Sequence, residues 1–196
     1  MLLKKTQNNT ILKRHPRKVV GIDVSTKLLD IAKTRFPDVE FQKMEMTDLR
    51  FPDNSFNLIY SSLTFHYAKD WDILLSGIYR VLKENGELFF STHHPVYWGS
   101  KGSTGNKYTN ARGIVVTEHT AILPADIEIT YYNHINEDAI REAVEHAGFK
   151  IIKSFAPSVI DIPVGELPKK DIVAYQKIKI KNEKMPLFFI IKAMKK

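Results

Sequence analysis

The chain has 196 residues, a length that allows one domain with a sizeable buried core. It contains no cysteine, which excludes disulfides, thiolate catalysis and cysteine-rich zinc sites. The net charge of +7 raises the question of an acidic partner, but much of the lysine excess gathers late in the chain without interleaved aromatic residues. The pattern therefore favours a solvated basic face over attraction to nucleic acid or a membrane, and its lysines are Lys177, Lys179, Lys181, Lys184, Lys192, Lys195 and Lys196.

Neither end of the sequence carries a membrane or export signal. The first eighteen residues hold no apolar stretch long enough for a signal peptide. The longest apolar run near the C-terminus, residues 187–191, is too short to cross a bilayer. Together with the absence of cysteine, these features predict a cytoplasmic protein.

The N-terminal half predicts two strands with a helix between them. Residues 18–22 form a short β-branched run that ends at Asp23, as in a buried parallel strand. Ser25 then caps a helix that stops at Pro37, and residues 39–43 follow as a second strand. The apolar positions of the helix are Leu28, Leu29, Ala32 and Phe36.

The middle of the chain repeats this alternation. Residues 56–60 predict a third strand after a Pro-Asp-Asn turn, and residues 87–92 predict a fourth. Between them Asp70 caps a helix that Asn85 and Gly86 end. Its apolar stripe consists of Trp71, Leu74, Leu75, Ile78 and Leu82.

The C-terminal half begins with a predicted loop over residues 99–113, rich in Gly, Ser, Thr, Asn and Lys. Two β-like runs follow, and Asn136 then caps a helix closed by Gly148. The β-like runs and the two final strands are predicted at 114–118, 127–132, 149–155 and 187–192. Strands that alternate with amphipathic helices imply a parallel sheet covered on both faces, an architecture that many enzyme families share.

Four segments, in order, resemble the class I S-adenosylmethionine (SAM)-dependent methyltransferases, in the branch that contains the ubiquinone and menaquinone biosynthesis enzymes. They read VVGIDVS (19–25), MTDLRFPDNSFNLI (46–59), RVLKENGELFF (80–90), and the closing pair AGFKIIKSF (147–155) and PLFFIIKAMK (186–195). The resemblance implies an α/β, doubly wound, Rossmann-like sheet with an antiparallel final strand. It also implies SAM as cofactor and methyl transfer to a nucleophilic atom of a small molecule.

The resemblance assigns cofactor roles to six residues. Asp23, at the end of a strand, would accept hydrogen bonds from both ribose hydroxyls, with Val24 beside it. Asp48 would lie near the adenine amino group and the Leu49 amide near a ring nitrogen, while Ser61 and Ser62 would line the methionine half. Each position also has a purely structural alternative: Asp23 as a helix-flanking residue, Asp48 as a turn former, and the serines as small residues that leave a strand.

Three side chains are candidates for catalysis: His66, Tyr67 and His93. In relatives the segment holding His66 and Tyr67 faces the methyl group, so that His66 could act as a base or merely wall the pocket. His93 and His94 are adjacent on an extended segment before Pro95, point to opposite sides and cannot easily chelate one metal ion. We therefore predict no metal site and favour substrate contact or structural placement for the two histidines.

The sequence departs from the family at its start. Relatives open with a central strand and a glycine-rich loop, whereas here about twenty residues precede Asp23 and Gly21 is the first glycine. We interpret residues 1–17 as the remnant of the first helix, the chain as N-terminally truncated, and cofactor affinity as weakened. Direct pairing of the two neighbouring strands, substitution by the N-terminal segment, or an oligomer would cover the gap.

The whole chain is predicted to be a single domain, in which residues 99–135 form a loop and strand insertion on the acceptor side. The alternatives to an active enzyme are an inactive methyltransferase-like interaction module and a truncated gene product. A nicotinamide-dependent oxidoreductase and an RNA methyltransferase are two further alternatives.

Overall fold

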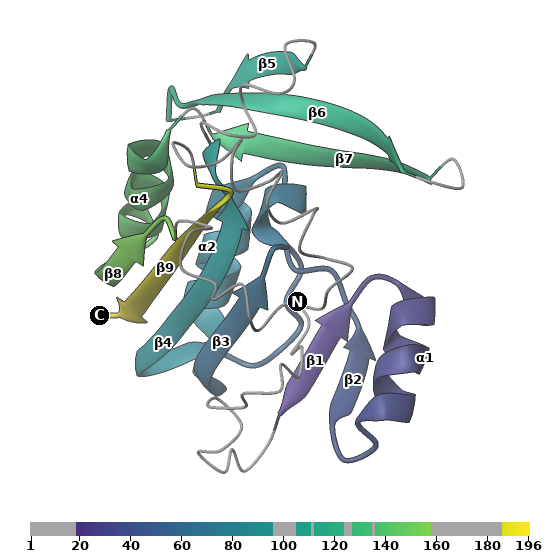
Figure 1. Ribbon diagram of the computed structural model, residues 1–196. Coiled ribbons are helices and arrows are strands. Elements are labelled where there is room, and N and C mark those ends of the chain that lie inside the picture. Colours follow the sequence, from purple (N-terminus) through teal and green to yellow (C-terminus); the bar gives the residue numbers. More distant parts are fainter. Residues whose placement is uncertain (1–18, 96–104, 111, 124–126, 135, 158–185) are drawn as a thin grey trace, which may run out of the picture.

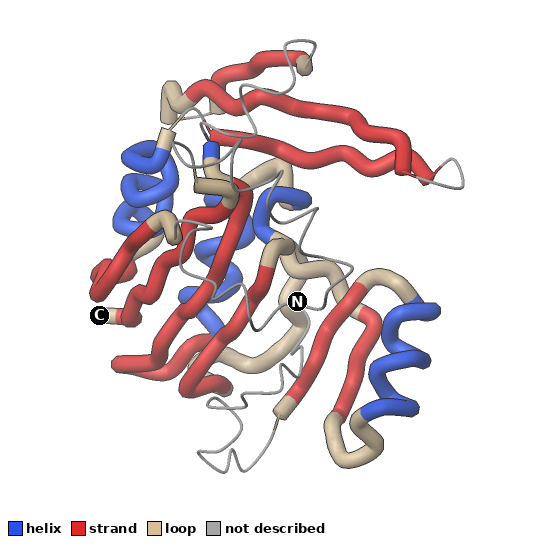
Figure 2. Tube along the Cα trace, viewed as in Figure 1, coloured by secondary structure: helices blue, strands red, loops and turns tan. Residues whose placement is uncertain are grey.

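The computed structural model describes residues 19–95, 105–110, 112–123, 127–134, 136–157 and 186–196. Figure 1 shows their helices and strands, and Figure 2 the same trace coloured by secondary structure. The elements are β1 Val20–Asp23, α1 Thr26–Arg35, β2 Glu40–Lys43, β3 Phe56–Ser62, the 3-10 turn η2 Phe65–Tyr67, α2 Trp71–Val81, β4 Leu82–His93, β5 Asn106–Thr109, β6 Val115–Leu123, β7 Ile127–His134, α4 Glu137–His146, β8 Phe149–Phe155 and β9 Phe188–Lys195.

The strands form three sheets. β1 and β2 are parallel, a second sheet has the order β3-β4-β9-β8, and β5, β6 and β7 form an antiparallel third sheet. In the second sheet β3 and β4 are parallel, whereas β9 runs antiparallel to both of its neighbours. The prediction of an antiparallel final strand is therefore confirmed.

The edges of β1 and β3 face each other without pairing. Within the described residues, β1 belongs to the sheet with β2, and β3 to the sheet with β4. Figure 1 shows the two strands pointing the same way on either side of this break. Direct pairing of these neighbours, one of the arrangements that the sequence left open, is thus absent. The predicted helix remnant at residues 1–17 lies outside the described residues.

The core of the second sheet packs against α2. Asp70 caps this helix, since its Oδ1 accepts hydrogen bonds from the amides of Asp72 and Ile73 at 2.9 and 3.1 Å. The predicted stripe is buried throughout, with Leu74, Leu75 and Ile78 fully inaccessible. Phe65, Phe90, Phe149 and Phe189 fill the space beneath it.

Three local predictions were wrong. Helix α2 ends at Val81, and Leu82 already belongs to β4, because the amides of Asn54 and Ser55 donate to the carbonyls of Arg80 and Val81 and draw the chain into the sheet. Leu28, expected on the buried face of α1, is 49% exposed. The third error is β5, which lies inside the predicted loop 99–113, because it is held by antiparallel pairing with β6.

The C-terminal elements otherwise follow the prediction. Asn136 caps α4 by accepting the Ala139 amide at 2.8 Å, and Gly148 has the positive φ of 97° that a helix C-terminus favours.

The lysines at 177, 179, 181 and 184 lie outside the described residues. Of the others in that basic set, Lys192 pairs with Glu87 at 2.6 Å and Lys195 donates to the Leu82 carbonyl at 2.9 Å. None of the helices that the structure describes is both long and apolar enough to span a membrane.

The sheet β5-β6-β7 lies across the carboxyl ends of β3 and β4 (Figure 1). Arg112 fixes it to α2, since its Nη2 and Nε contact the two oxygens of Asp72 at 2.8 and 3.1 Å. The Tyr108 hydroxyl donates to the Lys69 carbonyl at 3.1 Å. The insertion predicted at residues 99–135 therefore contributes, in its described part, a cover over the carboxyl edge of the main sheet.

Candidate functional site

Asp23 is the last residue of β1, and one oxygen of its carboxylate bonds to the backbone two residues later. Its Oδ1 accepts the amide hydrogen of Ser25 at 2.8 Å, and Ser25 in turn caps α1 by accepting the Leu28 amide. The helix-flanking role considered from the sequence is therefore real for one carboxylate oxygen. It does not exclude a ligand role, because a carboxylate offers about four acceptor positions. Val24, directly after it, is 60% exposed.

Asp48 and Leu49 follow β2, which lies beside β1. The Met44 amide donates to the Asp23 carbonyl at 3.1 Å and so joins the ends of the two strands. The Asp48 carboxylate lies 3.5 Å from Arg50 Nε in an exposed ion pair, whereas Leu49 is buried. Asp48 therefore presents its carboxylate to solvent at the same edge of the sheet as Asp23.

Arg80 of α2 holds the loop that follows Asp48. Its Nη2 donates to the Leu49 carbonyl at 2.5 Å, and its Nη1 donates to the Phe51 carbonyl at 2.8 Å and to Asp53 Oδ1 at 2.7 Å. In the sequence, Arg80 stands out only as the first residue of a segment that resembles the family. Its role depends on a contact across about thirty residues, which local patterns do not reveal.

Replacement of Arg80 by Met, which keeps the aliphatic stem, should lower the free energy of unfolding by about 1–2 kcal/mol, since hydrogen bonds to a charged group are lost at a half-exposed position. Urea unfolding measures this change. Arg50→Met removes the same charge from the exposed pair with Asp48 and should change stability by less than about 0.5 kcal/mol. Equal effects of the two substitutions would contradict a positioning role for Arg80.

The end of β3 is a tight, strained turn. Ser61 is fully buried and its Oγ contacts Thr64 Oγ1, whereas Ser62 is half-buried. Leu63 has a φ of +53°, a conformation that few residues other than glycine adopt. Its amide donates to the carbonyl and to the Oγ of Ser91 on β4. Because backbone strain of this kind clusters at functional sites, the conformation of Leu63 supports a functional site at this edge.

The three candidate catalytic side chains lie together. The rings of His66 and His93 are stacked, with centroids 3.5 Å apart and planes 7° from parallel, and Tyr67 lies 4.3 Å from His66. His66 is almost fully buried, while Tyr67 is 45% exposed. Burial, and secondly the neighbouring His93, lowers the pKa of His66 to about 3. Burial, and secondly His119, lowers the pKa of His93 to about 4.

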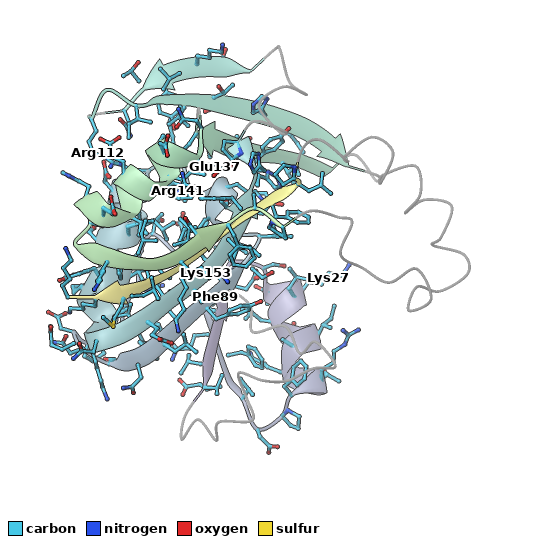
Figure 3. The ribbon with its side chains drawn as sticks, turned by 60° about the vertical axis from the view of Figure 1, so that its left-hand side comes forward. Lys27, Phe89, Arg112, Glu137, Arg141 and Lys153 are labelled. Carbon is cyan, nitrogen blue, oxygen red and sulfur yellow. The ribbon has the colours of Figure 1, made fainter. Side chains whose placement is uncertain are left out.

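His94 points away from this group, as predicted for adjacent residues on a strand. Its Nε2 lies 2.9 Å from Glu137 Oε1, and Glu137 also accepts from Arg141 at 2.6 Å. Figure 3 shows Glu137 and Arg141 together on α4. His94 thus has a structural partner on a helix, and Pro95 after it is buried. Among the residues with described positions, no group of three or more His, Cys, Asp or Glu side chains is arranged to hold a metal ion.

Strands β6 and β7 bring further rings to the site, none of which was among the candidates predicted from the sequence. His119 of β6 and Tyr131 of β7 are stacked with centroids 5.0 Å apart, and Tyr131 lies edge-on to His93 at 5.4 Å. His134 of β7 lies 4.4 Å from the Trp71 ring. Burial, and secondly the nearby Arg112, lowers its pKa to about 4. The available signal was the presence of His119 in β6 and of Tyr131 and His134 in β7.

The chain is similar in sequence to proteins of a known family. Residues 6–90 match the family model described as a methyltransferase domain. The demethylmenaquinone methyltransferase of Thermotoga maritima is 30% identical over 158 residues, covering 76% of this chain and 67% of that protein. An uncharacterised protein of Haemophilus influenzae is 35% identical over 95 residues, which cover 43% of this chain and only 37% of the relative.

The fold has counterparts among solved structures. A Listeria monocytogenes protein assigned to the S-adenosylmethionine-dependent methyltransferases superposes with a TM-score of 0.71 at 22% identity, over 94% of this chain and 83% of that one. At this level of identity the similarity establishes the fold. It is the Rossmann-like fold that the sequence predicted.

Proposed function

Because the chain belongs to the class I SAM-dependent methyltransferase family, we propose that it binds SAM at the carboxyl ends of β1, β2 and β3 and transfers the methyl group to a small-molecule acceptor. The observation that carries this proposal is the position of Asp23 at the end of β1, next to the exposed Val24 and beside the loop that bears Asp48. In open α/β sheets, ligands bind in the crevice outside the carboxyl ends of the strands.

The residues present fit the nucleoside half of SAM. In this proposal the Asp23 carboxylate accepts hydrogen bonds from the two ribose hydroxyls, and Val24 packs against the adenine. Asp48 accepts from the adenine amino group while the Leu49 amide donates to a ring nitrogen. Arg80 keeps these groups in place by holding the Leu49 and Phe51 carbonyls.

Fewer of the described residues are candidates for binding the methionine half of SAM. We assign Ser61 and Ser62, with the strained turn at Leu63, to this part of the crevice. The family's glycine-rich loop, which the sequence before Asp23 lacks, would supply further backbone amides.

The acceptor would bind beneath the sheet β5-β6-β7. When bound, SAM supplies an electrophilic methyl group, and its displacement is accelerated mainly by alignment of the two reactants and exclusion of water. The ties from Arg112 to Asp72 and from Tyr108 to Lys69 support this assignment, since they hold a cover over the carboxyl edge. No universal catalytic side chain is needed for such chemistry.

Calorimetric titration of the purified chain with S-adenosylhomocysteine, the demethylated cofactor, tests this function. Saturable binding of one ligand per chain is the expected result. A cooperatively folded chain that binds neither this ligand nor SAM would contradict the proposal. It would favour the second candidate, a methyltransferase-like interaction module, for which the break between β1 and β3 is the specific observation.

A further inference from the structure

The connection between β3 and η2 is short and fixed at both ends. Only Leu63 and Thr64 separate Ser62, the last residue of β3, from Phe65, the first residue of η2. Ser62 lies opposite Ser91 in the parallel pairing of β3 with β4, and Phe65 is fully buried in the core. Two residues between fixed points have little freedom, and Leu63 takes a φ of +53°, which its Cβ disfavours.

The Leu63 amide has two acceptors, and both belong to Ser91. It donates to the Ser91 carbonyl at 3.0 Å and to the Ser91 Oγ at 3.2 Å. The carbonyl alone would satisfy the amide, and any residue at position 91 would supply it, so the fold does not require a hydroxyl there. The second acceptor restricts the direction in which the amide points, because hydrogen bonds weaken steeply when they bend.

Ser91 reaches this amide because of its place in the pleat of β4. Side chains alternate between the two faces of a strand, and its neighbours Phe90 and Thr92 are both buried on the core side. The half-buried Ser91 therefore faces the other side of the sheet. On the core side, Ser61 lies opposite Phe90, and its Oγ contacts Thr64 Oγ1. The turn at the end of β3 is thus held from both faces of the sheet.

We propose that Ser91 is a positioning residue for the cofactor: through the Leu63 amide, its hydroxyl fixes the turn that borders the methionine half of SAM and so raises the affinity for that half. The inference rests on the proposed function and adds to it a residue on the neighbouring strand. A turn already held in its binding conformation loses less freedom when the ligand binds. The nucleoside half is assigned to Asp23 and Asp48, which follow β1 and β2, and does not depend on this turn.

Two ligands that differ only in the methionine half test the inference. S-adenosylhomocysteine carries the whole amino-acid chain, whereas 5′-methylthioadenosine keeps the nucleoside and the sulfur and ends in a methyl group. We expect Ser91→Ala to lower the affinity for S-adenosylhomocysteine by about three- to tenfold, up to the effect of one hydrogen bond, and that for 5′-methylthioadenosine by less than about twofold. Calorimetric titration measures the first affinity, and competition against S-adenosylhomocysteine measures the second.

Two further variants separate positioning from a general loss of stability. Ser91→Thr keeps a hydroxyl on the same carbon and should bind both ligands as the unmodified chain does. Leu63→Gly allows the turn to adopt its positive φ without strain. When Ser91→Ala is added to Leu63→Gly, it should therefore cost less than about twofold in affinity for S-adenosylhomocysteine, so that the two substitutions are not additive.

Ser154→Ala is the matched control. Ser154 lies on β8 of the same sheet, and its Oγ accepts a hydrogen bond from Arg141 Nε at 3.1 Å. This substitution also removes a side-chain acceptor from a half-buried serine, but at a strand that takes no part in the proposed cofactor site. It should leave the affinities for both ligands unchanged. Urea unfolding of each variant shows that the fold persists.

The outcomes distinguish this inference from the proposed function. Equal losses of affinity for the two ligands in Ser91→Ala, or no loss for either, overturn the positioning role and leave the cofactor site standing. A loss that is just as large in the presence of Leu63→Gly also overturns it. Failure of the unmodified chain to bind S-adenosylhomocysteine overturns the proposed function, and this inference with it. The inference requires a loss that is confined to S-adenosylhomocysteine and absent in Ser91→Thr.

Discussion

The free energy of unfolding should fall steeply as the pH drops from 6.5 to 5. Two buried histidines and the half-buried His93 have folded-state pKa values well below the ordinary 6.5: His66 at about 3, and His93 and His134 at about 4. Below pH 6.5 the unfolded chain therefore binds more protons than the folded chain, and stability is lost as the pH falls toward the folded-state values. At pH 5 the buried His66 and His134 should each cost about 2 kcal/mol, since one pKa unit corresponds to about 1.4 kcal/mol, and the half-buried His93 should cost less.

Urea unfolding at pH 7, 6 and 5 measures this loss. His66→Phe and His134→Phe each remove one of the titrating groups and should flatten the dependence of stability on pH. His146→Gln alters an exposed histidine and should leave the slope unchanged. A free energy of unfolding that stays constant between pH 6.5 and 5 would show that these rings are hydrated in the folded chain and would contradict their lowered pKa values.

Asp23→Ala should weaken binding of S-adenosylhomocysteine by at least about a hundredfold. The substitution removes the acceptor for two ribose hydroxyls, and hydrogen bonds to a charged group are worth about 1.5–3 kcal/mol each. It also removes the acceptor for the Ser25 amide, so the stability of the variant must be measured beside its affinity. Calorimetric titration gives the affinity.

Asp23→Asn tests how much the negative charge of Asp23 contributes to the affinity for S-adenosylhomocysteine. An asparagine oxygen can still accept the Ser25 amide hydrogen, so the turn should persist while the bonds to the ribose weaken, with a loss of about tenfold. Asp30→Asn, on the exposed face of α1, removes an equal charge and should leave the affinity for S-adenosylhomocysteine unchanged. Affinity that is unchanged in Asp23→Ala would refute the ribose assignment and leave the carboxylate with its structural role alone.

Much of the fold could be predicted because its signals are local. Ser25, Asp70 and Asn136 each begin the helix that the sequence assigned to them, since a capping side chain bonds to amides two or three residues away. β5 could not be predicted, because its polar sequence becomes a strand only by pairing with β6. The end of α2 depends likewise on amides from the loop at Asn54 and Ser55.

Part of the candidate site could likewise be predicted from the sequence, and part could not. Asp23, Asp48 and His66 could be proposed from their places in the sequence. The cofactor roles given to Asp23 and Asp48, and the catalytic role considered for His66, stay predictions. The contacts of Arg80 with the 49–53 loop, and the stack of His119 on Tyr131, join residues that lie far from the rest of the site in sequence. Such contacts follow from the tertiary packing of whole elements, which no pattern in a single sequence specifies.

Amide hydrogen exchange with and without S-adenosylhomocysteine tests most directly whether the crevice at the carboxyl ends of β1, β2 and β3 is the cofactor site. We expect slower exchange at Val24, Leu49 and the turn around Leu63 when the ligand is present, with little change in the amides of α4 and β8. Protection confined to other elements, or no protection at saturating ligand, would contradict it.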